Sequence, residues 1–515
     1  MASGAIKHLV IVGGGSAGWL TAGVLAAQHQ TASGGLQVTL IESPDVPIIG
    51  VGEGTWPSMR DTLSRIGVSE TDFLRCCDAS FKQGSLFRGW RDGGDDYYFH
   101  PFVLPQGYLD APLAARWGAQ FGNVPFADLV SFQPHLCMAG RAPKQITTPE
   151  YAAVANYGYH LDAGKFGAFL RQHCVEKLGV RHVSDHVLSI VSHENGDIAA
   201  LATRASGDVA GDLFIDCTGM QSLLLGQHYA VPLISQQHVL FNDSALAIQV
   251  PYPDDTTPVA SQTTSTAQQN GWIWDIGLPT RRGIGHVYSS AHTSDDAAEA
   301  ALRAYLKATG ARDTDGTARK LSFAPGYRRQ FWHRNCVAIG LSAGFIEPLE
   351  ASALALVELS AAMLADDMPA TRDAVDIIAR RFNEAFTYRW ERVIDFLKLH
   401  YVLSLRDDSD YWRDNRDQAG TPARLLEQLE LWRHRAPSRY DFPRIEEVFP
   451  SASYQYVLYG MGFTTDNALP LSRHEAANAD GFFKETASLT RKMLGALPSN
   501  RELLAHAARH GLHRI

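Results

Sequence analysis

Three glycines near the start of the chain could bring the backbone close to a phosphate group. Gly13, Gly15 and Gly18 form G-x-G-x-x-G between a predicted strand and a predicted helix, an arrangement that holds a pyrophosphate at a helix N-terminus. Glu42 ends the next predicted strand, 24 residues after Gly18 (42 − 18 = 24), close to where an acid would bind a ribose hydroxyl. The spacing predicts a dinucleotide site; a glycine-rich turn without a ligand is the alternative. The other residues of the predicted phosphate loop are Gly14, Ser16 and Ala17.

The continuation of the chain favours FAD over NAD as the dinucleotide. An NAD domain would continue in regular βαβ units, whereas here residues 50–57 form the glycine-rich stretch GVGEGTWP. Much later, DLFIDCTG at 212–219 and CVAIGLSAGF at 336–345 each combine a strand pattern with a glycine turn. If these two later segments also contact the nucleotide, the site extends along a long ligand, which suits FAD. From motif context, further FAD contacts are predicted at Val187, Leu341 and Leu354.

Several side chains that could react or recognise an aromatic ring stand in apolar surroundings. Lys82, in FKQGSLFRGW, would ordinarily face solvent; if buried, its amine becomes a usable nucleophile or hydrogen-bond donor. His100 and Phe102, in HPF, could form only a turn beside core aromatic residues. Glu347 and Glu350 could be a helix entry, where carboxylates favour the positive end of the helix dipole. None of these residues decides the function by itself.

The stretch GWIWDIGL, residues 271–278, carries unusual aromatic bulk. In a strand, Trp272, Trp274 and Ile276 would lie on one face. A buried core strand explains this pattern. A wall that confines a reactive species explains it too, and the octet does not separate these alternatives.

The elements that would position these residues form an α/β chain. Buried strands are predicted at 7–12 and 37–43 around a helix at 19–28, and helices dominate after residue 371. Further strand patterns lie at 180–191, 212–219, 245–250, 271–278 and 335–345. The pattern predicts a Rossmann-type FAD-binding module with an interleaved β-rich region over residues 1–370. Residues 371–515 would form a mainly helical part that completes the substrate pocket.

Composition excludes several classes of protein. The 515 residues are 45% hydrophobic and 20% charged, and the net charge of −9 argues against a nucleic-acid surface. No apolar run reaches the roughly 18 residues that cross a bilayer, and the N-terminus lacks a signal-peptide layout. The six cysteines show no CxxC pair and no metal-ligand spacing. A cytoplasmic protein with reduced, mostly structural thiols and no metal is expected.

Taken in order, the motifs resemble those of the flavin-dependent tryptophan halogenases. The resemblance rests on the glycine loop, GEGTWP at 52–57, Lys82, HPF at 100–102, GWIWDI at 271–276 and FIEPLEAS at 345–352. It covers nearly the whole chain, and G-W-x-W-x-I is its most specific part. The family fold is similar to that of the FAD-dependent hydroxylases, with a helical part that covers an aromatic substrate.

The resemblance implies a chemistry and a role for each matching residue. Reduced FAD from a separate NAD(P)H-dependent flavin reductase would activate O2, so that chloride or bromide becomes hypohalous acid. Lys82 matches the lysine that holds or carries the halogen, and Glu350 matches the glutamate that orients the electrophile or takes the ring proton. Trp272 and Trp274 would form the wall of the tunnel between flavin and substrate. The substrate pocket would include His100 and Phe102, and the halide would be held by the backbone amides of Ser352 and Ala353.

Two departures from the family pattern bear on halide and substrate. The family's PLESTGI reads PLEASAL here, which can alter the fit of the halide. The stretch SYQYVLYGMGF, 453–463, lacks the Phe-Trp pair that sandwiches free tryptophan and offers no grip for a carboxylate. Indole, another electron-rich arene, or a tryptophan within a larger molecule is therefore the expected substrate.

Two other functions remain as alternatives to halogenation. An FAD-dependent aromatic monooxygenase would hydroxylate its substrate without halide, although GWIWDI speaks against it. A flavin-binding partner or sensor without chemistry would not need both Lys82 and Glu350. The predicted partners are the flavin reductase and a small aromatic molecule, without nucleic acid or membrane, and a homodimer is left open.

Overall fold

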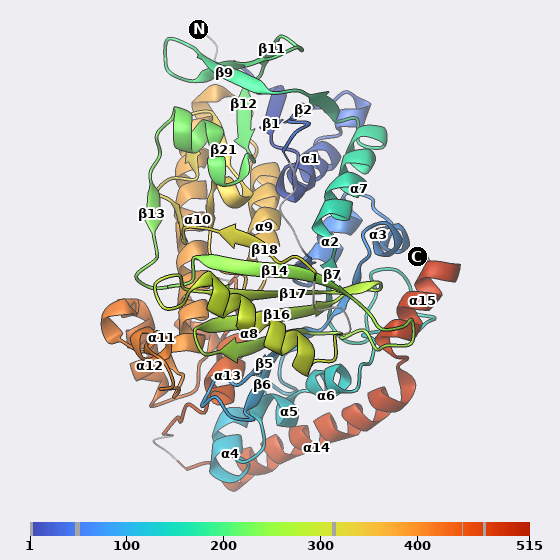
Figure 1. Cartoon of the computed structure of the whole chain (residues 1–515), viewed down its shortest axis with the longest axis vertical. Coiled ribbons are helices and arrows are strands. Elements are labelled where there is room, and N and C mark those ends of the chain that lie inside the picture. Colours follow the sequence, from blue (N-terminus) through green and yellow to red (C-terminus); the bar gives the residue numbers. More distant parts are fainter. Residues whose placement is uncertain (1–3, 47–51, 312–315, 445, 467–469, 515) are drawn as a thin grey trace. The chain divides into compact units, whose positions relative to one another are not determined.

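The chain folds into two compact units, each assembled from three separate stretches of sequence. The computed structural model describes residues 4–46, 52–311, 316–444, 446–466 and 470–514 (Figure 1). The first unit comprises residues 1–79, 161–236 and 324–390, and the second comprises 80–160, 237–323 and 391–515. This division differs from the boundary at residue 370 that the sequence predicted, because the inserted stretches at 80–160 and 237–323 fold together with the C-terminal part.

The first unit is built around a mostly parallel sheet of six strands. From one edge to the other the strands are β20 (Trp332–His333), β21 (Cys336–Ala338), β12 (Leu213–Asp216), β1 (His8–Val12), β2 (Gln37–Glu42) and β8 (Arg181–Ser184). Only β20 runs antiparallel to its neighbour. The central strands β1 and β12 are buried along nearly their whole length, as expected for a parallel sheet covered on both faces. This arrangement confirms the predicted α/β class.

Helices of the first unit pack around α1 (Ser16–Gln28), which contacts both α7 (Ala163–Glu176) and α9 (Ser352–Asp366). The short helices α2 (Ser58–Arg65) and α3 (Glu70–Cys76) pack on α9 and α7 respectively. The helix predicted from 19 to 28 therefore begins three residues earlier, directly after the glycine loop.

Two small sheets complete the first unit. The first contains β9 (Val187–Ser192), β10 (Ile198–Thr203) and β11 (Asp208–Ala210); the second contains β13 (Leu233–Ser235), β19 (Gly326–Arg328) and β22 (Gly344–Phe345).

A seven-stranded sheet forms the centre of the second unit. Its order is β18 (Arg319–Ser322), β14 (Ser244–Pro251), β17 (Arg281–Tyr288), β16 (Gly271–Gly277), β15 (Thr263–Gln268), β5 (Gly84–Arg88) and β6 (Tyr97–Pro101). Neighbouring strands are antiparallel except β15 and β5. Helix α8 (Asp295–Ala308) covers one face, where Ile273 and Ile284 pack against Leu302. In a further small sheet, β4 (Ser80–Lys82) pairs antiparallel with β7 (Gly158–Leu161).

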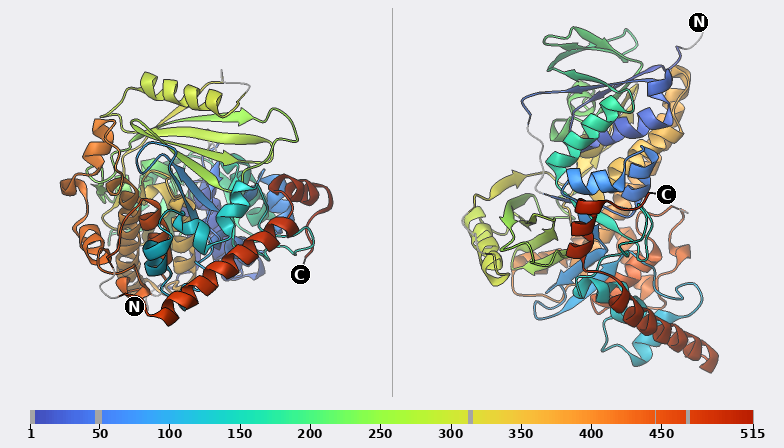
Figure 2. Two further views of the ribbon diagram at one scale, coloured as in Figure 1. Left: turned by 90° about the horizontal axis from the view of Figure 1, so that it is seen from below. Right: turned by 90° about the vertical axis from the view of Figure 1, so that its right-hand side faces the viewer.

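The remaining helices of the second unit surround this sheet. They are α4 (Leu113–Gln120), α5 (Phe126–Val130), α6 (Gln133–Met138), α11 (Asp410–Asn415), α12 (Ala423–Trp432), α13 (Ser451–Gly460), α14 (Arg473–Ala496) and α15 (Asn500–His510). Helix α14 is the long straight helix near the end of the chain (Figure 2), and α4, α5 and α6 pack on it. It begins with a capping box, in which Ser472 and Glu475 satisfy each other's backbone N–H groups. The helix α10 (Arg372–Val402) contributes residues to both units.

Within the described part of the chain, no helix combines the length and the apolar character that crossing a membrane requires. All six cysteines carry free thiols, and five of them are buried.

Candidate active site

The glycine loop follows β1 as predicted and leads directly into α1. A side chain on Gly13 would stand 2.1 Å from the carbonyl oxygen of Cys217, and one on Gly18 would stand 1.9 Å from that of Gly13. These two glycines therefore allow strand, loop and helix to pack closely. A side chain on Gly15 would meet nothing within 4 Å. Helix α1 starts at this open position without a side-chain cap, so its first N–H groups are available to a pyrophosphate.

Glu42 lies beside this loop at the end of β2. A Cβ atom on Gly14 would approach the Glu42 carboxyl carbon to 2.2 Å, so a larger residue there would displace this carboxylate. One carboxylate oxygen of Glu42 is 3.1 Å from His182 Nε2 and 3.8 Å from Arg171 Nη1. The loop and the acid are thus adjacent, as a site for the ribose and phosphate groups of FAD requires.

Two distant segments return to the same edge of the sheet. After β21 the backbone turns at Gly340, whose φ is +77° and whose Cβ would stand 2.7 Å from that of Ala17. Leu341 belongs to the 3-10 helix Gly340–Ser342 that follows this turn. After β12, the buried carboxylate of Asp216 accepts hydrogen bonds from the backbone N–H groups of Leu224 and Leu225, at 2.8 and 2.9 Å. Asp216 therefore fixes the chain there.

The two other predicted FAD contacts lie on the same unit. Val187 opens β9 directly after His186, whose ring is 3.1 Å from Ser43 Oγ, just beyond Glu42. Leu354 is buried in the first turn of α9, a helix that packs on α1. Of the predicted loop GVGEGTWP, Gly50 and Val51 lie outside the described residues.

Glu350 is buried in a tight turn that leads into α9. Its backbone carbonyl accepts a hydrogen bond of 2.8 Å from the indole Nε1 of Trp56. The turn is closed by a 3.1 Å hydrogen bond from Ala351 N to the carbonyl of Pro348, and Ala351 has a φ of +55°. Ala351 supplies no side-chain cap. The first N–H groups of α9, at Ser352 and Ala353, thus have no intrahelical acceptors and can bind an anion.

Lys82 is buried, with only 1% of its surface exposed. It ends β4 in the second unit, and its Nζ atom lies 5.4 Å from the centroid of the Phe102 ring. The ring face is an attractive surface for an amine cation. The structure therefore brings together two of the residues singled out in the sequence, and it removes the alternative of an ordinary solvent-facing lysine.

A histidine that the sequence did not single out faces Lys82. In the β4–β7 pair, Ser80 lies opposite His160 and Lys82 lies opposite Gly158, so Lys82 and His160 are diagonal neighbours on one face. His160 is fully buried, and its Nε2 is 2.8 Å from Thr263 Oγ1. Burial, together with the nearby Lys82, lowers the pKa of His160 well below its ordinary value. His160 is therefore neutral at pH 7.

His100 lies among aromatic side chains that come from distant parts of the sequence. Its Nε2 is 2.8 Å from Ser453 Oγ on α13, and its ring centroid is 5.5 Å from that of Phe396 and 6.3 Å from those of Phe449 and Tyr456. Phe396 and Phe449 stack at 3.8 Å. Only His100 of this group was predicted, because the others carry no motif and are spread over the helical part of the chain.

The backbone beside Phe102 is fixed by two further residues that sequence reasoning missed. The buried Gln133 accepts hydrogen bonds from the N–H groups of Phe102 and Val103, at 2.9 and 3.0 Å. Asn156 donates to the carbonyl of Phe102 at 3.0 Å. These hydrogen bonds fix the backbone of Phe102, and the fixed backbone helps to hold the Phe102 ring against Lys82.

Trp272 and Trp274 share one face of β16, as the alternation predicted. Their ring centroids are 6.4 Å apart, and Trp272 lies 6.2 Å from the buried Trp90. Trp274 packs over Gly285 on β17, where a Cβ atom would stand 2.0 Å from the ring. In the second unit the pair is part of an aromatic core. Its role as a tunnel wall stays a prediction.

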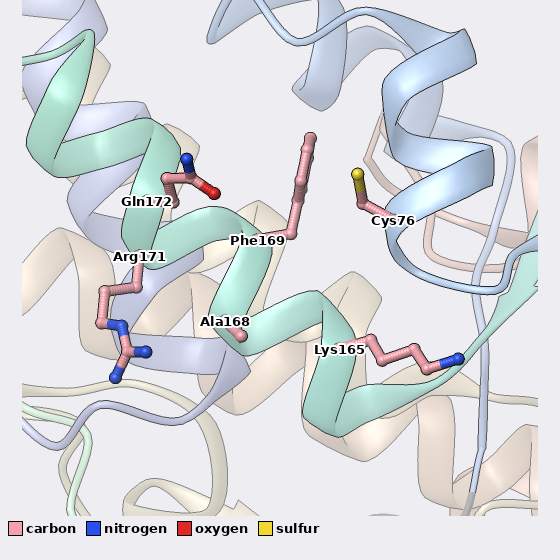
Figure 3. A pocket seen from close by; sticks show the side chains of 6 residues that line it. All are labelled: Cys76, Lys165, Ala168, Phe169, Arg171 and Gln172. Carbon is pink, nitrogen blue, oxygen red and sulfur yellow. The ribbon is translucent and has the colours of Figure 1, made fainter.

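A surface hollow of about 480 Å³ lies elsewhere on the first unit. Figure 3 shows Phe169 extending from α7 toward Cys76 on α3. The hollow is lined by Cys76, Lys165, Ala168, Phe169, Arg171 and Gln172. None of these was predicted as a site residue, although Arg171 also contacts Glu42. Among the residues that the structure describes, no three His, Cys, Asp or Glu side chains gather as a metal site would require.

The chain is similar to known proteins over nearly its whole length. The sequence model of the family described as tryptophan halogenase matches residues 8–477. The chain is 33% identical to the 7-chloro-L-tryptophan 6-halogenase KtzR of Kutzneria sp., over 96% of this chain and 99% of the relative. It is 32% identical to the tryptophan 7-halogenase RebH of Lentzea aerocolonigenes, over 98% and 99%. The crystal structure of a tryptophan halogenase from Shewanella frigidimarina superposes with a TM-score of 0.96, at 51% identity and 99% coverage of both chains.

Proposed function

The chain belongs to the tryptophan halogenase family, whose members are flavin-dependent enzymes, and we propose that it halogenates an indole-like arene with reduced FAD, O2 and chloride or bromide. The observation that carries the proposal is the burial of Lys82 against Phe102. An amine kept away from bulk water is suited to hold a reactive halogen that water would otherwise disperse.

The first unit offers the residues that would hold FAD. The open space at Gly15, the uncapped start of α1 and the adjacent carboxylate of Glu42 fit its pyrophosphate and ribose groups. When bound and reduced, FAD would supply the electrons that activate O2, and the activated oxygen would be the oxidant that converts halide into hypohalous acid. A separate flavin reductase delivers the reduced cofactor.

The proposed halide site uses backbone rather than side chains. The N–H groups of Ser352 and Ala353, at the positive end of α9, offer hydrogen bonds to an anion. Backbone amides are the same for any residue except proline, so the PLEASAL sequence can keep the site. The side chains that differ set the fit between the smaller chloride and the larger bromide.

Lys82 and Glu350 have complementary roles in the proposed reaction. The amine nitrogen of Lys82 takes the halogen from hypohalous acid, releasing water and forming an N–halogen bond, or holds the acid by a hydrogen bond. The aromatic carbon then takes the halogen as the N–halogen bond breaks. The ring proton leaves to the carboxylate of Glu350, and the nitrogen of Lys82 regains one proton, so that the amine is restored. The neutral His160 beside Lys82 adds no second positive charge to that place.

The surroundings of His100 support a flat aromatic substrate. Phe396, Phe449 and Tyr456 present rings, and Ser453 presents a hydroxyl that contacts His100. The stretch 453–463, which includes Ser453 and Tyr456, contains no lysine or arginine to pair with the carboxylate of a free amino acid. We therefore propose indole or an indole derivative rather than free tryptophan as the substrate.

Product analysis tests the proposal. The purified chain is incubated with FAD, a flavin reductase, NADH, O2 and indole or free tryptophan, with bromide, with chloride or with neither. We expect a halogen isotope pair by mass spectrometry only when halide is present, and faster conversion of indole than of free tryptophan. A mass gain of one oxygen that does not depend on halide would overturn the halogenase assignment in favour of a monooxygenase.

A further inference from the structure

A hydrogen bond joins the GEGTWP loop to the turn that carries Glu350. Trp56 lies between β3 (Glu53–Gly54) and α2, and its Nε1 donates to the Glu350 carbonyl at 2.8 Å. The two residues are 294 positions apart in the sequence but belong to the same unit. Indole N–H is only a donor. Among the 20 amino acids, tryptophan is alone in placing such a donor on a large, rigid ring.

The peptide bond that Trp56 contacts is held from both sides. Its oxygen, from Glu350, accepts the indole hydrogen bond, while its nitrogen, from Ala351, donates to the Pro348 carbonyl at 3.1 Å. Ala351 then adopts φ +55° and ψ +39°, a left-handed conformation that a residue with a Cβ atom rarely takes. Such a conformation persists only when its surroundings enforce it. The bond from Trp56 is one of the interactions that do so.

The helices that follow the loop and the turn are tied together independently. Glu358 on α9 is buried, and its carboxyl group is 2.6 Å from Thr62 Oγ1 and 3.3 Å from Ser58 Oγ on α2. This contact fixes α2 to α9 whether or not Trp56 makes its bond. Loss of the indole N–H would therefore loosen the turn without detaching the two helices.

We propose that Trp56 is a positioning residue of the proposed halogenation site, holding the Glu350–Ala351 peptide so that the Glu350 side chain and the first amides of α9 point correctly. The inference rests on the proposed function for its catalytic meaning, but the link between the loop and the turn stands on geometry alone. Trp56 acts through Glu350, Ser352 and Ala353, with no contribution to the chemistry of its own.

The variant Trp56→Phe tests this proposal because it keeps an aromatic ring and removes the N–H donor together with the five-membered ring that carries it. A lost hydrogen bond of this kind corresponds to about a fivefold effect. We expect the KM for bromide and chloride to rise about fivefold, while the KM for the arene and the affinity for FAD stay within twofold of the wild type. A general structural defect would instead weaken all of them together, and that result would overturn the proposal.

Trp332→Phe is a matched control in the same unit. Trp332 Nε1 also donates to a backbone carbonyl, that of Arg334, at 3.0 Å. Trp332→Phe removes the same kind of hydrogen bond as Trp56→Phe, but it does so where no site residue is predicted. Equal effects of the two variants on the halide KM would contradict a specific role for Trp56.

A second variant tests the mechanism by rescue. Glycine adopts the left-handed conformation without a steric cost, so Ala351→Gly should let the turn form without help from Trp56. We expect Ala351→Gly to lower the halide KM of Trp56→Phe by at least threefold more than it changes that of the wild type. Additive effects of the two substitutions would show that Trp56 does not act through this turn.

Amide hydrogen exchange provides a readout that does not need catalysis. In Trp56→Phe, the peptide that covers residues 346–354 should exchange faster, while the peptide around Trp332 should be unchanged. Unchanged exchange at 346–354 would overturn the proposal whether or not the protein halogenates indole. Faster exchange in a protein without halide-dependent product would uphold the link and reject only the proposed function.

Discussion

Trp274 on β16 and Gly285 on β17 lie directly opposite each other, and the tryptophan ring occupies the space that a side chain at 285 would need. The large ring of Trp274 in GWIWDI is thus accommodated by the missing side chain of Gly285 in RRGIGHVY. Gly285→Ala should force the ring to move, because its Cβ would stand 2.0 Å from ring atoms. We expect a loss of about 1–3 kcal/mol in the free energy of unfolding, measured by denaturant titration with tryptophan fluorescence.

Gly481→Ala is the control for this substitution. Gly481 lies inside α14, and a Cβ there would meet nothing within 4 Å. Alanine should stabilise that helix by up to about 1 kcal/mol. A Gly285→Ala variant as stable as the wild type would show that Trp274 can leave its place freely, which would also weaken its proposed role as a wall.

The sequence predicted the glycine turn after β1 and its closeness to the end of β2 well because this information is local, while the binding of a nucleotide there stays a prediction. The turn at Gly13–Gly18, the acid at Glu42 and the start of α1 depend on neighbours along the chain and on one adjacent strand. The fold class followed from the same periodicity, and the comparisons confirm the family. Alternation also placed Trp272 and Trp274 on one face correctly.

What the sequence did not predict depends on contacts between distant segments. The aromatic group around His100 comes from residues near 400 and 450, and Trp56 meets Glu350 across most of the chain. Hydrophobic periodicity shows that a residue is buried but not which partner it meets. The grouping of the inserted stretches into one unit also depends on such a contact, since β15 pairs with β5, which lies far earlier in the chain.

Replacement of Lys82 should abolish halogenation while leaving the fold and FAD binding intact. Lys82→Met keeps most of the side-chain length and the apolar stem against Phe102 but removes the amine. We expect product formation to fall at least about 100-fold, in the range found when a catalytic group is removed. Product is quantified by mass spectrometry, and bound FAD by absorbance after gel filtration.

Lys165→Met serves as the control, because it makes the same chemical change at a lysine whose side chain is 52% exposed. Its product yield should match that of the wild type. Retention of more than a tenth of the activity in Lys82→Met would show that the buried amine is not needed to carry the halogen.

The aromatic group around His100 should determine affinity for the arene and not for the halide. Phe449 stacks on Phe396 with a centroid distance of 3.8 Å and lies 6.3 Å from the His100 ring. Phe449→Leu keeps an apolar side chain but removes a stacking surface worth about 1 kcal/mol. We expect the KM for indole to rise about fivefold and the KM for bromide to stay unchanged in steady-state assays. A change in the bromide KM alone would place the substrate elsewhere.

The buried carboxyl group of Glu358 should make stability depend on pH. Burial raises the pKa of Glu358 to about 8, from an ordinary value of 4.5. The folded state therefore binds more protons than the unfolded state between these values, so the contribution of Glu358 to stability falls as the pH rises from about 5 through 8. Glu358→Gln cannot ionise and still offers a carbonyl oxygen to Thr62.

The expected result is a difference in Tm between Glu358→Gln and the wild type that grows in favour of the variant from pH 6 to pH 9. Calorimetry at several pH values measures this difference directly. Glu475→Gln is the comparison: hydrogen bonds with Ser472 lower the pKa of Glu475, so this exposed carboxylate is ionised throughout that range in both states. Its difference in Tm should stay constant with pH. A difference for Glu358→Gln that is equally constant would mean that the carboxyl group is already charged at pH 6 and that α2 and α9 are joined by an ionised, not a neutral, acid.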